Sequence, residues 1–343
     1  MGGVIEAARK GRANLAASHR MSWWYQERQV LAVWPAILVL FVWATINTPA
    51  FASPANLLNV LQQAAVLSFL TLAMLLVLLA GKFDLSIEST VGFAPMLAAH
   101  LVVAQPYGFG TNLNPFLGLA IIVALGALIG FVNGLLVVRL KLNAFITTLA
   151  VLILLRGSTL GISSGRTIFN PPDVFTFLGG TDVGVVPLSV IATVVLFVLV
   201  WVFLTYHRVG RNIYAIGGNP VAARAAGIDV DKTVWGLYVV AGMLAAIAGV
   251  ILSGRIGSVV ASQGQNEVFD VFAALAIGAV SLNGGRGSVF GALTGVLFLS
   301  FLANVLVLSQ VPSFWIDASR GAVIVAALVL ARYTSRDGGE ATN

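Results

Sequence analysis

Residues 115–138 read PFLGLAIIVALGALIGFVNGLLVV and contain no charged side chain. A helix that crosses the hydrocarbon core of a bilayer needs about 20 consecutive, mostly apolar residues, and this stretch provides them. Comparable apolar runs recur along the chain at 30–46, 57–80, 83–104, 143–162, 187–205, 232–253, 267–283, 287–308 and 315–333. The sequence therefore predicts an all-α polytopic membrane protein with about ten transmembrane helices.

The composition of the 343 residues agrees with this fold class. Hydrophobic residues make up 59% of the chain, charged residues only 9%, and the mean hydropathy is +0.97. Soluble domains carry roughly 25% charged residues, so a soluble globular protein is excluded. The chain has no cysteine, which excludes disulfides, thiolate nucleophiles and iron–sulfur ligands. Its three histidines are too scattered along the sequence to predict a metal site.

The distribution of charge predicts the orientation in the membrane. The 19 Lys and Arg residues outnumber the 13 Asp and Glu residues, and they flank the apolar runs, which indicates membrane orientation rather than nucleic-acid binding. With the amino terminus inside, the basic residues are cytoplasmic with four exceptions: Arg156, Arg166, Arg255 and Arg320. We expect a cytoplasmic, lipid-contacting tail over 1–28, a transmembrane domain over 29–333 and a cytoplasmic tail over 334–343.

Two connections between spans are long. The outer one, 163–186, contains Pro-Pro and Gly-Gly pairs and is predicted to be an irregular loop. The inner one, 206–231, is predicted to contain a short helix, with Asn219 as N-cap, Pro220 at the first helical position and Gly227 as a left-handed stop. A helix this short is not stable alone in water, so it docks either on its own membrane domain or on a separate cytoplasmic subunit.

Polar side chains within the apolar runs are the candidates for a translocation pathway. Asp84 and Glu88 have the i, i+4 spacing that would place them on one helical face, and an intramembrane carboxylate is a functional candidate because its exposure to lipid is costly. Uncharged polar residues more often hold helices together by hydrogen bonds. The candidates are Gln62, Gln63, Asp84, Ser86, Glu88, Asn133, Thr147 and Arg156. Glu267 and Asp270, in the first turn of the eighth run, are predicted instead to complement the helix dipole.

Two rows of glycines at four-residue spacing predict close helix packing. One row is Gly126, Gly130 and Gly134, and the other is Gly287, Gly291 and Gly295. The sequences GALIG at 126–130 and GALTG at 291–295 also form a weak internal repeat. The repeat is predicted to be inverted, because these two spans run in opposite directions in the expected topology.

Motifs for catalysis are weak. The P-loop spacing of an ATPase does not occur, and NGGRGS at 283–288 does not match it. Ser163 lies in a G-x-S-x-G pattern, but the pattern is at the end of a span and not after a strand. The residues therefore indicate a transport protein rather than an enzyme. A self-sufficient ion-coupled transporter that uses Asp84 and Glu88 stays open at this point.

Several motifs together resemble one known family. They are FDLSI at 83–87, GFVNG at 130–134 followed by RLKLN at 139–143, LRG at 155–157, the segment 210–228 and GGRGSV at 284–289. With these motifs, the chain from the second span to Arg332 is similar to the permease subunits of ribose-type sugar ABC importers, relatives of the branched-chain amino acid permeases. Many members have glycine where Glu88 stands in this chain. They also often carry a glutamate close to the start of the eighth span, where Glu267 and Asp270 stand here.

The resemblance implies a permease of the bacterial cytoplasmic membrane that imports a monosaccharide or polyol. It also implies a homodimer, two copies of a cytoplasmic ATPase that bind ATP and Mg, and a periplasmic or lipid-anchored binding protein; the permease itself binds no cofactor, metal or nucleic acid. Branched-chain amino acids or nucleosides are the alternative solutes. The family's coupling helix, which contacts the ATPase, corresponds here to Asn219, Pro220, Ala222, Ala223, Arg224, Ala226 and Gly227.

Overall fold

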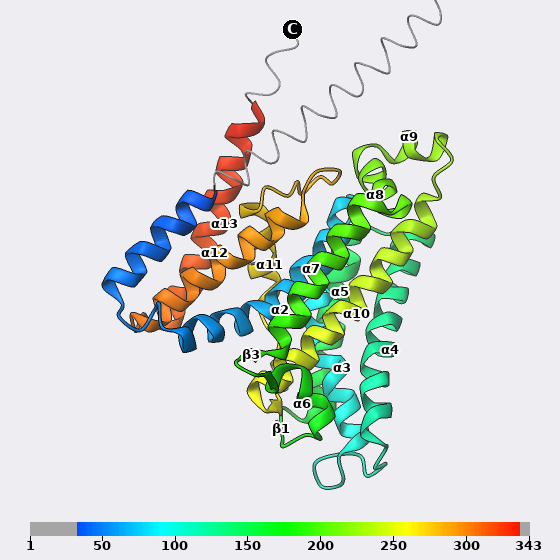
Figure 1. Ribbon diagram of the computed structural model, residues 1–343. Helices are drawn as coiled ribbons and strands as arrows, with labels where there is room; N and C mark the ends of the chain where they lie inside the picture. The colour runs from blue at the N-terminus through cyan, green and yellow to red at the C-terminus, as the bar shows by residue number, and fades with distance from the viewer. Residues whose placement is uncertain (1–32, 337–343) are drawn as a thin grey trace, which may run out of the picture.

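The computed structural model describes residues 33–336, and this part of the chain is almost entirely helical (Figure 1). Six of its helices are long and apolar enough to cross a membrane, and their bounds are α2 (Pro54–Leu79), α4 (Pro115–Gly134, continued by a π-helical turn over Leu135–Arg139), α5 (Ala144–Ser163), α7 (Leu188–Tyr206), α10 (Val230–Ile256) and α12 (Val289–Leu308). The predicted all-α, multi-pass fold is therefore confirmed. The predicted tail over 1–28, and residues 337–343 of the second tail, lie outside the described residues.

The predicted number of spans is not confirmed, because several apolar runs form shorter helices. The first run gives a helix over Val33–Asn47, the third gives α3 (Ile87–Val102) and the eighth gives α11 (Glu267–Ile277). Helix α3 begins four residues later than predicted because residues 80–86 form turns, and α11 ends where Gly278 packs against the Gly291 carbonyl. The last run forms α13 (Ser313–Arg336).

Helix α10 lies at the centre of the bundle and packs against α2, α3, α4 and α6. Its closest neighbour is α4, at a crossing made of glycines. A Cβ at Gly130 would lie 2.0 Å from the Tyr238 carbonyl oxygen, and one at Gly126 would lie 2.4 Å from the Gly242 carbonyl oxygen. Gly134 faces the Trp235 ring. Only a helix without side chains at these positions can approach α10 so closely.

The second glycine row is used at another crossing, between α12 and α11. A Cβ at Gly295 would lie 1.9 Å from the Ala274 carbonyl oxygen, and one at Gly291 would lie 2.2 Å from the Gly278 carbonyl oxygen. Gly287 precedes α12 in a turn with a φ of +149°. Both rows thus bring helix backbones into contact, while the inverted repeat stays a prediction.

The outer connection 163–186 is not an irregular loop, so this prediction is wrong. It contains β1 (Ile168–Phe169), α6 (Asp173–Gly180), β2 (Asp182–Val183) and β3 (Val186–Pro187). Strand β1 pairs antiparallel with β4 (Ser258–Val259), and β2 pairs antiparallel with β3. The Pro-Pro pair starts α6 instead of breaking it, and Gly179 lets α6 lie on α10, where a Cβ would be 1.9 Å from the Ile251 carbonyl oxygen.

The inner connection contains two helices, at the opposite end of the bundle from α6 and β3 (Figure 1). They are α8 (Arg208–Gly218), which the sequence analysis missed, and α9 (Pro220–Ala225), which it predicted. Ile213 and Ile216 of α8 are buried. The Tyr214 hydroxyl donates to the Gly287 carbonyl at 3.0 Å, so α8 is tied to the turn that precedes α12.

Candidate functional site

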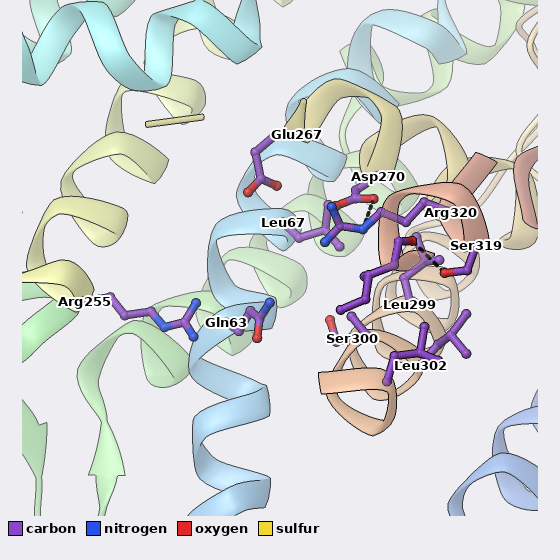
Figure 2. A pocket seen from close by; sticks show the side chains of 13 residues that line it. Gln63, Leu67, Arg255, Glu267, Asp270, Leu299, Ser300, Leu302, Ser319 and Arg320 are labelled. Atoms are coloured by element: carbon purple, nitrogen blue, oxygen red, sulfur yellow. Dashed lines mark hydrogen bonds and ion pairs between the residues drawn. The ribbon is translucent and has the colours of Figure 1, made fainter. Parts of the chain in front are cut away.

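A first pocket lies between α2, α10, α11, α12 and α13. It is lined by both polar and apolar side chains (Figure 2). The lining residues are Gln63, Leu67, Arg255, Glu267, Asp270, Leu299, Ser300, Leu302, Ala303, Leu306, Ile316, Ser319 and Arg320. A polar pocket inside such an apolar chain is a functional candidate, because polar surface is costly in a membrane domain.

The four charged side chains of this pocket balance one another in formal charge. Arg255 extends from the end of α10, Glu267 and Asp270 from the first turn of α11, and Arg320 from α13 (Figure 2). Arg320 Nε forms an ion pair with Asp270 Oδ1 at 3.2 Å, and Arg320 Nη1 donates to Asp317 Oδ1 at 3.1 Å. The pocket therefore contains one closed ion pair, and its two other charges face the open volume.

Glu267 and Asp270 lie in the first turn of α11, where they can complement the helix dipole as predicted, and the same turn also receives a hydrogen-bond acceptor from another helix. Glu88 Oε2 of α3 accepts a hydrogen bond from the Val268 backbone N–H at 3.3 Å. Glu267 also lines the pocket, and Asp270 is also paired with Arg320.

Glu88 also forms an ion pair with Arg156 of α5, through Arg156 Nη2 and Glu88 Oε1. Both line a second pocket with Ser89, Gly92, Thr159, Leu160 and residues 261–263 and 265. The Glu88 side chain is only 3% exposed, whereas that of Arg156 is 38% exposed. Glu88 thus joins α3, α5 and α11, and Arg156 presents the accessible charge.

Asp84, Ser86 and Asn133 form a separate, fully buried cluster. Asp84 Oδ1 accepts from the Ser86 hydroxyl at 2.6 Å and from Asn133 Nδ2 at 3.3 Å, and Asn133 Nδ2 also donates to Ser86 Oγ at 2.7 Å. Asp84 Oδ2 and Asn133 Oδ1 have no hydrogen-bond partner in the part of the chain that the structure describes. Asp84 and Glu88 are therefore not on one helical face, because Asp84 precedes α3 and Glu88 lies within it.

We expect Asp84→Asn to keep or raise the thermal unfolding temperature, because it removes a buried charge and replaces an oxygen without a donor by an amide group. Asp84→Ala should lower the stability by about 1–3 kcal/mol, because the Ser86 and Asn133 donors lose their acceptor. Thermal unfolding of both variants in detergent measures the difference. Equal losses in the two variants would contradict this expectation and would show that the ionised carboxylate is required.

The remaining pathway candidates lie in different surroundings. Gln62 Nε2 donates to the Gly179 carbonyl at 2.7 Å and so holds α6. Thr147 is buried on α5, and Gln63 is the one candidate that lines the first pocket. Sequence reasoning did not select Arg255 or Arg320 for a site. A signal was present, because both are among the four basic residues that fall outside the expected cytoplasmic side.

Helix α9 is anchored on its own chain at one position. Ala223 is buried in the main core, whereas Val221 is 76% exposed. Arg224 is exposed and pairs with Asp231, which raises the pKa of the Arg224 guanidinium. Asn219 Oδ1 accepts from the backbone N–H groups of Val221 and Ala222 at 3.0 Å, as predicted for an N-cap. The outward-facing groups of α9 thus include Val221 and Arg224, while Ala223 faces inward.

Two further sites considered from sequence lack the geometry for chemistry. The Ser163 hydroxyl donates to the Thr159 carbonyl at 2.8 Å and accepts from the Gly165 N–H at 3.2 Å, so it completes the end of α5. His100 Nδ1 is hydrogen-bonded to the Met96 carbonyl instead of to Ser163. Within residues 33–336, no group of three or more His, Asp or Glu side chains is arranged to hold a metal ion.

Most of the chain matches one family of membrane proteins. The family described as the permease component of branched-chain amino acid transport systems matches residues 56–328 of this chain. The chain is 35% identical over 312 residues to the ribose import permease protein of Escherichia coli (strain K12), which covers 90% of this chain and 94% of that protein. It is 35% identical over 310 residues to the ribose import permease protein of Bacillus subtilis (strain 168), with the same coverage of the two chains.

Relatives with another named solute are similar to the same degree. The chain is 35% identical over 301 residues to the autoinducer 2 import system permease protein of Enterobacter sp. (strain 638), which covers 88% of this chain and 85% of that protein. No solved structure matches the chain at a significant level.

Proposed function

Because the chain belongs to the family of branched-chain amino acid transport system permease components, we propose that it is the membrane-spanning permease subunit of a sugar ABC importer. The observation that carries the proposal is the 35% identity to ribose import permeases, which extends over 90% of this chain. These relatives are transport components rather than enzymes, and the chain itself performs no catalysis in this proposal.

The solute is a monosaccharide or a related polyol that a binding protein delivers from outside. Two copies of the chain form the pathway in the bacterial cytoplasmic membrane, with both termini inside, and a separate ATPase binds ATP and Mg²⁺. Alternating access of this kind needs a helical bundle with two stable arrangements and no reactive group on the permease. The charge distribution of the sequence supports the orientation, with α8 and α9 on the cytoplasmic side.

Purification of the tagged full-length chain from its own cells in a mild detergent tests this proposal. Mass spectrometry of the co-purifying proteins should identify an ATPase with a P-loop. Recovery of the chain alone in several detergents would contradict the proposal. It would favour an ion-coupled transporter, whose uptake follows an ion gradient and ignores ATP depletion.

Helix α9 is the proposed contact with the ATPase, and the exposed Val221 provides the sharpest test. Val221→Glu places a charge on the apolar outer surface of α9 and should reduce recovery of the ATPase at least about tenfold, the effect of losing about 1.4 kcal/mol of binding energy. Val185→Glu is the matched control, because Val185 is 78% exposed in the turn between β2 and β3 at the opposite end of the bundle (Figure 1). Equal recovery with both variants would show that α9 does not contact the ATPase.

The role of Arg224 can be separated from its ion pair with Asp231. The double variant Arg224→Asp/Asp231→Arg keeps an opposite-charge pair within the chain but moves the positive charge. We expect recovery of the ATPase to fall with the single variant Arg224→Asp, and to fall equally with the double variant. Full recovery of the ATPase with the double variant would mean that Arg224 only stabilises the inner connection.

A further inference from the structure

The first pocket contains four polar side chains without a hydrogen-bond partner in the part of the chain that the structure describes. Gln63, Arg255, Glu267 and Ser300 come from α2, α10, α11 and α12, and their side chains form no hydrogen bond with any of residues 33–326. Figure 2 shows the Arg255 and Gln63 side chains extending toward each other, with the Glu267 carboxylate on the neighbouring helix. Four different helices therefore direct unused donors and acceptors to one volume.

Neighbouring polar groups in the same region do have protein partners. Asp270 is paired with Arg320, the Ser319 hydroxyl donates to the Ile316 carbonyl at 2.7 Å, and Gln62 donates to Gly179. A partly buried polar group without a hydrogen bond is costly, so folded chains usually provide a partner for it. The unused groups of this pocket are accessible from its open volume and can therefore form hydrogen bonds with a ligand.

The chemistry of the lining selects a neutral ligand with several hydroxyl groups. The two arginines and two carboxylates cancel in formal charge, so the pocket attracts neither an anion nor a cation. A carboxylate accepts hydrogen bonds from hydroxyls, a guanidinium donates to hydroxyl oxygens, and an amide or serine does both. Leu67, Leu299 and Leu302 add an apolar surface that suits the C–H face of a sugar ring.

We propose that this pocket is a binding site on the permease itself for a neutral polyhydroxylated solute, recognised by Gln63, Arg255, Glu267 and Ser300. The proposal rests on the proposed function and adds that the permease has its own affinity for the solute, in addition to any binding protein. It also makes a statement about specificity that experiment can test: hydroxyl groups, and not the ammonium and carboxylate of an amino acid, pair with these four side chains.

Direct binding to the purified full-length permease tests this site. The probes are radiolabelled ribose, xylose, galactose, ribitol and myo-inositol, with radiolabelled leucine as the zwitterion, measured by scintillation proximity without a binding protein. At least one polyol should bind saturably, and leucine should not compete with it. Binding of leucine alone, or of none of the probes, would overturn the proposal.

Variants of the lining side chains then locate the binding. Glu267→Gln and Gln63→Leu should each weaken binding of that polyol about tenfold or more, because each removes hydrogen bonds to the ligand. Gln62→Leu is the matched control, because Gln62 precedes Gln63 on α2 but holds α6, so this variant should lower stability and leave the affinity unchanged. Equal affinities for the Gln62 and Gln63 variants would place the binding elsewhere.

Failure of this site can be told apart from failure of the proposed function. Suppose that the permease co-purifies with its ATPase and supports ATP-dependent uptake, but that Glu267→Gln leaves this uptake unchanged. This result would support the proposed importer function and contradict the proposed binding site. Ser300→Ala removes a single oxygen and is the variant least able to unfold the bundle. It should weaken binding a few-fold, and normal binding together with an unaffected Glu267→Gln variant would refute the site.

Discussion

Gly130→Ala should unfold the bundle or strongly destabilise it, whereas Gly161→Ala should leave it intact or stabilise it. The added Cβ at Gly130 would lie 2.0 Å from the Tyr238 carbonyl oxygen, so α4 and α10 must separate at their closest crossing. Overpacking of this kind costs about 1–3 kcal/mol or more, and backbone leaves less room for relaxation than a flexible side chain. At Gly161 nothing lies within 4 Å of the added atom, so helix propensity favours alanine by about 1 kcal/mol.

The measurement is the thermal unfolding of both variants in detergent, followed by the size-exclusion profile. Trp235 provides a local fluorescence signal, because its Nε1 donates to the Phe131 carbonyl at 3.0 Å near the same crossing. The expected result is a lower midpoint for Gly130→Ala and an equal or higher midpoint for Gly161→Ala. A shift of the same sign and size in both would mean that α4 and α10 are not in contact as described.

This glycine contrast also shows what the sequence could predict about packing. The four-residue spacing of Gly126, Gly130 and Gly134 marked one face of α4 for close approach. It did not identify the partner helix, because other spans also carry small residues at four-residue spacing, among them Gly242 and Ala246 of α10 and Gly291 and Gly295 of α12. The partner became evident only from the positions of Gly242 and the Tyr238 carbonyl.

The long helices were predictable because apolar length decides them locally. Helices α2, α4, α5, α7, α10 and α12 all lie within or close to the predicted apolar runs. The shorter α3 and α11 were predicted too long, because tertiary contacts decide where they begin or end. Residues 80–86 leave the helix because the Asp84 carboxylate accepts from the Ser86 backbone and hydroxyl, a local hydrogen bond that competes with helix formation.

The candidate site was only partly predictable, because its members come from helices far apart in the sequence. Gln63 was selected as a polar residue in a span, but Glu267 was interpreted as a cap and Arg255 was used only for orientation. A better indication of the site was the set of basic residues that do not lie on the expected cytoplasmic side of the membrane. Three of these four, Arg156, Arg255 and Arg320, line one of the two pockets.

The different exposure of Glu88 and Arg156 predicts that loss of one partner destabilises the protein more than loss of the other. Arg156→Met should be more destabilising than Glu88→Gln, because the two substitutions leave different charges behind. Without Arg156, the carboxylate of Glu88 remains in a position that is 3% exposed, and loss of one partner from a buried pair costs about 3–5 kcal/mol. Without the Glu88 charge, the Arg156 guanidinium is still 38% exposed and can be solvated.

Thermal unfolding of the two single variants and of the double variant Glu88→Gln/Arg156→Met measures this asymmetry as a double-mutant cycle. The double variant should be more stable than Arg156→Met alone, because it leaves no unpaired charge and the amide oxygen introduced by Glu88→Gln can still accept from the Val268 N–H. Arg166→Met is the control, because Arg166 is exposed just beyond the end of α5 and its loss should change stability by less than about 0.5 kcal/mol. If Glu88→Gln is the more damaging single variant, the charge of Glu88 serves a function beyond the ion pair, and the second pocket, not the first, becomes the place to seek the solute.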